Sequence, residues 1–176
     1  MIKFETHTVR KIYVEDAKGI HALMIANKER FKTYFPKTLD QNLTLEASLK
    51  FTQEKTTLFA AKEEFLFVIK KNYTDQILGL IYIKELDWTK RQGEFAYCID
   101  ANFQGKGLIS KAVKRLSEYA FKEFGLKTLQ IIVHKDNKAS AKVAEKCNFS
   151  WQKTLLKEFT PPNESPLDME LYELYQ

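Results

Sequence analysis

Glycine and proline are scarce in this chain of 176 residues, which has 6 glycines and 4 prolines. Phenylalanine and tyrosine are abundant, so the composition argues against wholesale disorder and predicts one domain over residues 1–176. Cysteine is scarce too, because Cys98 and Cys147 are the only two. They form neither a metal-ligand spacing nor a C-x-x-C redox pair, and we expect reduced thiols.

Long hydrophobic runs are also absent from the sequence. No apolar run approaches the roughly 18–20 residues that a membrane-spanning helix needs. The first residues, MIKFETHTVRK, lack the apolar centre of a secretory signal. We therefore expect a soluble cytoplasmic protein with no membrane partner.

Dense basic runs are missing although the formal net charge is +5. A positive charge suits anionic partners such as phosphates, acidic proteins or nucleic acid. The lysines, however, alternate with glutamates along the chain, which is typical of a solvated surface. The sequence shows no clustered basic and aromatic face, so direct nucleic-acid binding is not expected.

The hydrophobic periodicity changes along the chain and predicts a mixed α/β (α+β) fold. Helices are expected over 15–31, with Asp16 as N-cap, over 44–55 from Thr44, over 108–124 before Gly125, and over 137–147. Strands are expected over the following segments: 6–14, 64–71, 76–86, 93–100, 127–134, 151–159 and 167–176, the last after a turn at 160–166. Short connections make strands 64–100 an antiparallel meander, and residues 95–133 form a parallel crossover. About four helices would cover a mostly antiparallel sheet.

The stretch FQGKGLISKAVKRL, residues 103–116, places two glycines and a lysine directly before a helix. Gly105 and Gly107 permit close approach of the backbone, and the helix start offers N–H groups and a positive dipole end. Lys106 and Lys111 add positive charge nearby. The pattern is neither a Walker A loop nor a full dinucleotide fingerprint, because Ser110 stands where a third glycine would be. Alone, it is compatible with a phosphate cradle or with an ordinary loop.

Two neighbouring segments resolve this ambiguity by resemblance to the GNAT superfamily of acetyl-CoA-dependent N-acetyltransferases. Gln104, Gly107 and Ile109 fall on the anchors of its Q/R-x-x-G-x-G/A loop, although Ile109 departs from Gly or Ala. The turn GKG, followed by an apolar pair and Ser, resembles the Rim-type branch that acetylates N-termini of ribosomal proteins. GEFAYCID is similar to the family's E-x-G-Y-x-I strand, with Ala96 replacing glycine.

The segment NKASAKVAEKCNF is similar to N-x-x-S-x-x-V/L-x-E-K-x-G-F of the same branch, with Asn148 replacing glycine. The matching residues are Asn137, Ser140, Val143, Glu145, Lys146 and Phe149. The resemblance covers nearly the whole chain. It implies a GNAT-type sheet of seven strands, splayed between the fourth and fifth strands.

The resemblance also implies where acetyl-CoA, the co-substrate, would bind. The pantetheine arm would pair with the backbone of the 93–100 strand and with Asn137, and the pyrophosphate would lie on the glycine turn. The implied cofactor-binding residues are Tyr97, Cys98, Ile99, Gln104, Gly105, Lys106, Gly107, Leu108, Ile109, Ser110, Asn137, Ser140 and Lys146. No metal is expected, since His7, His21 and His134 show no ligand spacing.

The chemistry implied by the family is direct attack of an amine on the thioester carbonyl in a ternary complex. The tyrosine that many members use as general acid is replaced by Ala144, and the Rim-type branch suggests Ser140 instead. Glu94 is the candidate general base, acting through water; the alternative is a strand-edge glutamate that faces solvent. Asp100 is a weaker candidate because it is expected to cap the loop after the strand. Cys98 is expected to be a buried cysteine with no catalytic partner.

The acceptor amine is left open by the sequence. Tyr34, Phe35 and Trp88 are candidate substrate-binding residues, with ordinary packing as the alternative for each. The resemblance favours a protein N-terminal α-amine, with a small amine (polyamine, amino acid or antibiotic) or a non-catalytic CoA-binding domain as alternatives. The protein is expected to be a monomer or a homodimer.

Overall fold

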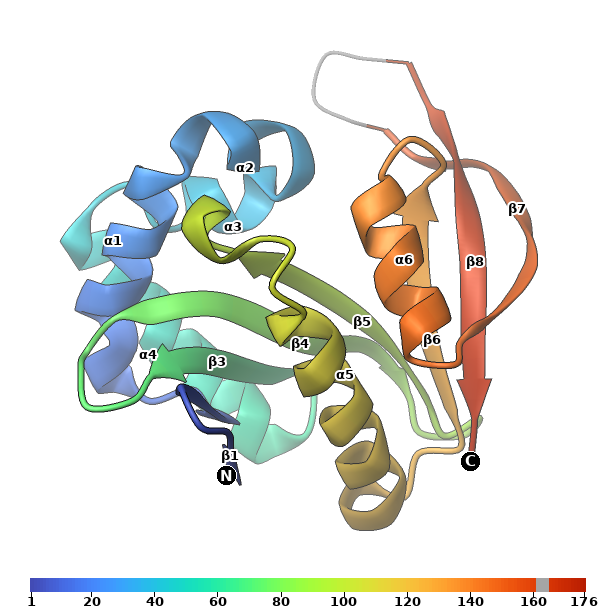
Figure 1. Cartoon of the computed structure of the whole chain (residues 1–176), viewed down its shortest axis with the longest axis horizontal. Helices are drawn as coiled ribbons and strands as arrows, with labels where there is room; N and C mark the ends of the chain where they lie inside the picture. The colour runs from blue at the N-terminus through green and yellow to red at the C-terminus, as the bar shows by residue number, and fades with distance from the viewer. Residues whose placement is uncertain (161–164) are drawn as a thin grey trace. The chain divides into compact units, whose positions relative to one another are not determined.

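A computed structural model describes residues 1–160 and 165–176 of the chain (Figure 1). The strands are β1 (Ile2–Lys3), β2 (His7–Lys11), β3 (Phe65–Lys71), β4 (Ile77–Asp87), β5 (Gln92–Ile99), β6 (Thr128–His134), β7 (Ser150–Phe159) and β8 (Leu167–Tyr175). The α-helices are α1 (Ala17–Ala26), α2 (Lys28–Tyr34), α3 (Pro36–Asp40), α4 (Leu45–Ala61), α5 (Leu108–Tyr119) and α6 (Lys138–Lys146). The predicted 160–166 turn includes residues 161–164, which lie outside the described residues.

The strands form one sheet in the order β1-β2-β3-β4-β5-β6-β8-β7. β5 and β6 pair in parallel, whereas β1–β2, β2–β3, β6–β8 and β7–β8 pair antiparallel. The predicted mixed, mostly antiparallel sheet with a parallel crossover is therefore confirmed. Over residues 1–160 and 165–176 the sheet has eight strands where seven were expected, because the two-residue β1 is too short to leave a periodic signal.

Contacts group the chain into two compact units. Unit 1 comprises Met1–Tyr82 and Tyr97–Lys106, and unit 2 comprises Ile83–Ala96 and Gly107–Gln176. Unit 1 contains α1 to α4, β1 to β3, the first part of β4 and the end of β5. Unit 2 contains the rest of β4 and β5 together with β6 to β8, α5 and α6. The two long central strands, β4 and β5, are thus shared between the units.

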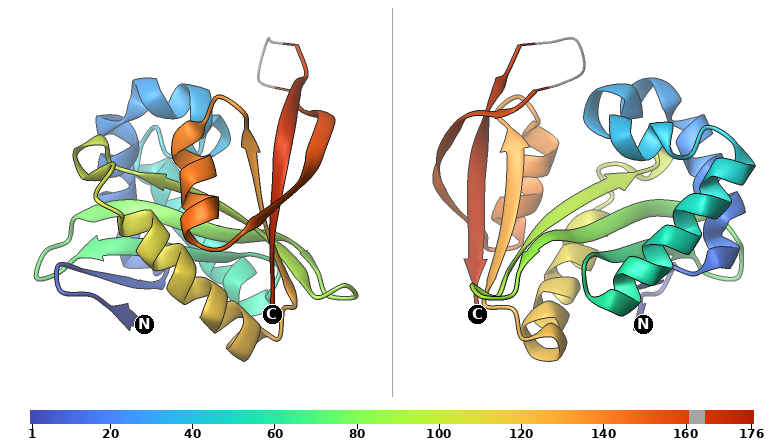
Figure 2. Two further views of the ribbon diagram at one scale, coloured as in Figure 1. Left: turned by 45° about the vertical axis from the view of Figure 1, so that its right-hand side comes forward. Right: turned by 180° about the vertical axis from the view of Figure 1, so that it is seen from behind.

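The core of unit 1 is built on the apolar runs of β3 and β4, whose first residues are buried without alternation. Such continuous runs are typical of strands covered on both faces. In this unit α4 packs against β3, and α1 packs against α4 (Figure 2). Gly19 lets α1 approach β4 closely, because a Cβ there would lie 2.6 Å from Cγ1 of Ile77. The packing of α4 on β3 and of α1 near β4 therefore contributes to the burial of these strands.

The helix predicted over 15–31 is interrupted. α1 ends at Ala26, and Asn27, with φ −117° and ψ 18°, separates it from α2. Asp16 does precede α1, but its carboxylate accepts from Arg10 and from the amide of Tyr13 and does not cap the helix. The short α3 in the same region was not predicted.

The helix expected from Thr44 is confirmed but is longer than predicted. The Thr44 hydroxyl accepts from the amide of Ala47 at 3.1 Å, which is an N-cap interaction. The helix continues to Ala61 and ends at Lys62, whose φ of 57° is left-handed. The helix was predicted to end at residue 55, which is six residues too early, because residues 56–61 continue the helix without a strong apolar stripe.

Unit 2 follows the predicted pattern closely. Ile109, Ala112, Val113 and Leu116 are buried on one stripe of α5, and a π-helical turn, Ala120–Phe124, ends at Gly125 with φ 69°. β6 alternates between buried and half-buried residues, and α6 packs against it. No helix within residues 1–160 and 165–176 is long and apolar enough to cross a bilayer.

Candidate active site

The burial pattern changes at the end of β5. Burial alternates from Gln92 to Phe95, but Cys98 and Ile99 are then buried one after the other. On β4, a Cβ at Gly79 would lie only 2.4 Å from the carbonyl oxygen of Cys98, so this close approach requires glycine.

Peptide geometry fixes the direction of the Ile99 carbonyl. The Asp100 amide donates to the Leu78 carbonyl of β4 at 2.7 Å. In a planar trans peptide the C=O and N–H point in opposite directions, so the Ile99 carbonyl points away from β4. There it accepts a hydrogen bond from Nη2 of Arg30 on α2. Of the three backbone positions predicted for pantetheine, Ile99 therefore has its carbonyl already bound by a side chain.

Asp100 caps the turn that follows β5, as expected from the sequence. Its carboxylate accepts from the Asn102 amide at 2.8 Å, and its side chain is buried. Cys98 is buried as well, and burial is the main cause that raises the pKa of its thiol to about 12. A thiol with this pKa is protonated at neutral pH and is a poor nucleophile, which agrees with the structural role expected for it.

The glycine turn has the backbone conformation that its sequence predicts. Gly105 and Gly107 have φ values of 74° and 75°, in the left-handed region that favours glycine. A Cβ at either position would meet nothing within 4 Å, so the conformation and not crowding selects glycine. Gly107 is the N-cap of α5 and has no side chain to bond the amides of the first turn. This arrangement suits an anion at the start of α5.

The remaining residues of the turn have different environments. The Lys106 amine lies 4.9 Å from the centroid of the Phe103 ring, and Gln104 is exposed. Ile109 is buried in the apolar stripe of α5, so its departure from Gly or Ala has a packing reason. The carbonyl of Ser110 accepts from the Cys147 thiol at 3.2 Å.

Asn137 begins α6. Its Oδ1 accepts from the Ser140 amide at 3.2 Å, so the side chain of the motif asparagine is the N-cap of this helix. Lys146 is exposed in the last turn of α6, and nine residues of helix separate it from Asn137 by about 13 Å. The structure therefore brings Ser140, but not Lys146, close to Asn137. Asn148 has φ 64°, which asparagine tolerates better than most residues and which explains how it replaces a glycine.

Glu94 lies inside the sheet and not at a solvent edge. It stands opposite Gln130 of β6, and its Oε1 is 2.8 Å from Nζ of Lys84 on β4. The Glu94 side chain is 15 % exposed. Burial is the main cause that raises the pKa of its carboxyl; Lys84 opposes this, and the negative charges of Glu85 and Glu158 reinforce it. A raised pKa makes this carboxylate a stronger base than an ordinary glutamate.

The predicted acceptor residues divide into two kinds. Tyr34, at the end of α2, is 60 % exposed. Phe35 packs against the rings of Phe31 and Tyr82, with centroids 6.4 and 5.9 Å away, as ordinary packing would give. Trp88 is 42 % exposed in the connection between β4 and β5. Only Tyr34 and Trp88 thus present a large exposed surface.

Asn27 and Arg30 were missed by the sequence analysis, although both contact the end of β5. Asn27 Oδ1 accepts from the Ala101 amide at 2.9 Å and from Arg30 Nη2 at 3.0 Å. No motif marked them, since they stand in a segment that reads as one helix. An asparagine within a helical pattern is the one available signal, and it is weak.

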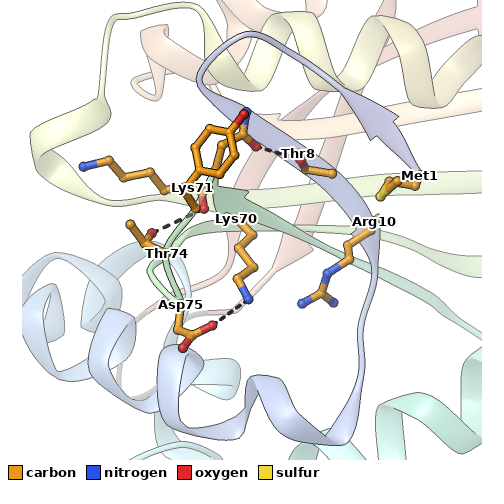
Figure 3. Close-up of a pocket in the computed structure, with 9 residues that line it drawn as sticks. Met1, Thr8, Arg10, Lys70, Lys71, Thr74 and Asp75 are labelled. Carbon is orange, nitrogen blue, oxygen red and sulfur yellow. Dashed lines mark hydrogen bonds and ion pairs between the residues drawn. The ribbon is translucent and has the colours of Figure 1, made fainter.

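A surface pocket elsewhere in unit 1 contains none of the predicted site residues (Figure 3). It is lined by Met1, Thr8, Arg10, Lys70, Lys71, Asn72, Tyr73, Thr74 and Asp75. Two of its cations are already paired: Arg10 with Asp16 at 2.6 Å and Lys70 with Asp75 at 2.8 Å. Within the described residues, no group of three His, Cys, Asp or Glu side chains could hold a metal ion.

Comparison of the sequence with known protein families agrees with this fold and with these motifs. The family described as "Acetyltransferase (GNAT) domain" matches residues 7–150. The chain therefore belongs to the GNAT acetyltransferases, and the resemblance read from its three motifs is confirmed. It is an N-acetyltransferase of this family.

Two curated relatives illustrate the range of the family. The chain is 29 % identical over 150 residues to "Probable N-acetyltransferase YjcK" of Bacillus subtilis, covering 85 % of this chain and 83 % of that protein. It is 35 % identical over 81 residues to the spermidine N(1)-acetyltransferase of Escherichia coli K12, covering 46 % of this chain and 44 % of that protein.

Two solved structures share the fold. The ribosomal-protein-S5-alanine acetyltransferase from Vibrio fischeri superposes with a TM-score of 0.91 at 23 % identity, covering 99 % of this chain and 95 % of that one. The Microcin C7 self immunity acetyltransferase MccE, in complex with acetyl-CoA and AMP, has a TM-score of 0.87 at 23 % identity and covers 98 % and 94 %. These likenesses confirm the predicted GNAT fold class.

Proposed function

We propose that residues 1–176 form a single GNAT domain that transfers the acetyl group of acetyl-CoA to a primary amine, and that this amine is a protein N-terminal α-amine. The observation that carries this proposal is the left-handed glycine turn that opens α5 without a side-chain cap. In a GNAT chain we expect the backbone amides of this turn to bind the pyrophosphate of acetyl-CoA. The complex of MccE with acetyl-CoA supports the choice of donor.

The residues present fit the donor. Amides of residues 104–110, including Gly105, Gly107 and Leu108, would bind the pyrophosphate. The backbone of Tyr97, Cys98 and Ile99 would pair with the pantetheine arm. Because Arg30 holds the Ile99 carbonyl, we expect the amide of Ile99 to make that contact. Asn137 uses Oδ1 as a helix cap, so its Nδ2 group would donate to pantetheine. Bound acetyl-CoA would supply an activated acyl group.

Proton transfer is assigned to Glu94 and Ser140. The amine nitrogen forms a bond to the acetyl carbon while the carbon–sulfur bond breaks. Glu94, through a water molecule, would take the proton that the amine loses, and its raised pKa favours this. Ser140 would give a proton to the departing thiolate and would regain one from solvent, to which Glu94 releases the proton that it accepted.

Two acceptor classes have support. The likeness to the S5-alanine acetyltransferase and the Rim-type turn favour a protein N-terminus. The 35 % identity to a spermidine N(1)-acetyltransferase over 81 residues favours a polyamine as the second candidate. Tyr34 and Trp88 are proposed as acceptor-binding residues, because each exposes a large ring surface on its own unit. We further propose a monomer or homodimer that binds no metal for catalysis.

The acceptor class is tested by comparing kcat/KM for peptides with Ala or Ser N-termini and for spermidine, following release of free thiol. A peptide preference of at least about 10-fold supports the first class, which corresponds to roughly 1.4 kcal/mol in the transition state. The reverse preference overturns it in favour of the polyamine. An N-terminally blocked peptide of the same sequence is the matched control, since it lacks only the α-amine.

A further inference from the structure

Two side chains from the α1–α2 junction hold the backbone at the end of β5. Asn27 is buried, and its Nδ2 donates to the Leu23 carbonyl at 3.0 Å, which fixes the orientation of the amide. Its Oδ1 therefore faces the Ala101 amide and Arg30 Nη2. The same Nη2 also donates to the Ile99 carbonyl.

These bonds fall on both sides of Asp100. Ile99 is held through its carbonyl by Arg30, and Ala101 is held through its amide by Asn27. Asp100 itself donates to the Leu78 carbonyl of β4 and caps the next turn with its carboxylate. Three consecutive residues are thus fixed by partners on both sides of the strand. The glycine turn begins directly after this segment.

The guanidinium lies beside the end of β5, the segment whose backbone is expected to pair with the donor. The Ile99 carbonyl points away from β4, which is the side of the strand available for an added hydrogen-bonding partner. Arg30 is half-buried and its guanidinium also lies 4.9 Å from the centroid of the Phe31 ring. Its hydrogen bond to the Ile99 carbonyl keeps this peptide in one orientation, and its hydrogen bond to Asn27 holds the guanidinium in place. The neighbouring backbone groups of β5 are thereby kept aligned.

We infer that Asn27 and Arg30 are positioning residues for acetyl-CoA, which orient the end of β5 and the start of the glycine turn from the N-terminal helices. This role rests on the proposed function, because it concerns the same donor. It acts through the backbone of Ile99 and Ala101, and neither side chain needs to contact the donor.

The test measures CoA binding by isothermal titration with Arg30→Met, which keeps an apolar stem over Phe31 and removes the donors. We expect the dissociation constant to rise about 10-fold, because binding must then order the Ile99 peptide that Arg30 otherwise holds in place, at a cost of roughly 1.4 kcal/mol. Lys32→Met is the matched control: it removes the same charge from α2, and Lys32 pairs at the surface with Glu29. It should bind CoA as the unchanged protein does.

A second pair of variants separates positioning from stability. Asn27→Ala removes the acceptor for the Ala101 amide, whereas Asn27→Asp keeps an oxygen there. We expect a raised KM for acetyl-CoA with Asn27→Ala, partial rescue with Asn27→Asp, and an unchanged KM for the amine. Unchanged CoA affinity in Arg30→Met and Asn27→Ala, with only a lower melting temperature, would overturn the inference and leave the proposed function standing. Failure of the unchanged protein to bind CoA would overturn both.

Discussion

Glu94 combines burial with one cationic and two anionic neighbours. Burial raises the pKa of its carboxyl, the Lys84 ammonium on β4 lowers it, and Glu85 and Glu158 raise it further. Gln130 stands opposite it on β6, but the Gln130 side chain bonds to Gln92 and Glu173. The pH at which this carboxyl can accept a proton is therefore set by the balance between desolvation and Lys84.

Replacing Lys84 with Met should shift the acidic limb of the kcat/KM–pH profile to higher pH. A base works when it is deprotonated, and loss of the ammonium removes the influence that favours the carboxylate, so the pKa of Glu94 rises. Lys90→Met is the control, because Lys90 is 73 % exposed and pairs with Asp87. Glu94→Gln should abolish most turnover while CoA affinity is kept. An acidic limb that stays in place in Lys84→Met, or wild-type turnover in Glu94→Gln, would remove Glu94 as the base.

Asn137 has two roles that substitutions can separate. Its Oδ1 caps α6, and its amide nitrogen is proposed to bind pantetheine. Asn137→Ala should weaken CoA binding about 10-fold and cost about 1 kcal/mol of unfolding free energy, because both roles are lost. Asn137→Ser keeps a capping oxygen, so it should lose affinity but little stability. Denaturant unfolding and CoA titration check the pair; full affinity in Asn137→Ser would refute the pantetheine contact.

At the scale of elements, the start of α5 depends on glycine conformation. Gly107 is the N-cap at φ 75°, and Gly125 closes the following π-helical turn at φ 69°. A Cβ at either would meet nothing within 4 Å. Gly107 and Gly125 thus have similar left-handed conformations, but only Gly107 belongs to the turn that is proposed to bind the pyrophosphate.

Gly107→Ala and Gly125→Ala should each cost about 1 kcal/mol of unfolding free energy, because alanine is strained in the left-handed region. Only Gly107→Ala should also weaken CoA binding. Relief of the strain at this position would reorient the backbone amides at the start of α5, which are proposed to bind the pyrophosphate. Calorimetry of CoA binding and thermal unfolding of both variants are the measurements. Equal CoA affinities in the two variants would mean that the turn does not bind the donor.

Local signals explain why most elements could be predicted from the sequence. The Thr44 cap, the stripe of α5, the stop at Gly125 and the alternation of β6 all depend on neighbouring residues. The break at Asn27 could not be predicted in the same way, because the side-chain oxygen of Asn27 accepts a hydrogen bond from the backbone amide of Ala101, far along the chain. β1 was missed because two residues carry no period.

At the scale of the whole molecule, the family could be read from three ordered motifs, but the contacts between distant segments could not. Arg30 and Ile99 are 69 positions apart, and no spacing rule connects them. Likewise, the ion pair of Glu94 with Lys84 depends on the register of two strands. The sequence indicated the residues of the turn, and the structure added the side chains that hold it in place.

The central claim is that this chain moves an acetyl group from acetyl-CoA to an amine. Its most direct test is mass spectrometry of an acceptor panel, with peptide N-termini and spermidine, after incubation with acetyl-CoA and the unchanged protein. The account predicts that at least one acceptor gains a single acetyl group on its amine, and that Glu94→Gln largely abolishes the product. A panel without any acetylated product, from a protein that still binds CoA, would contradict the account and indicate a non-catalytic CoA-binding domain.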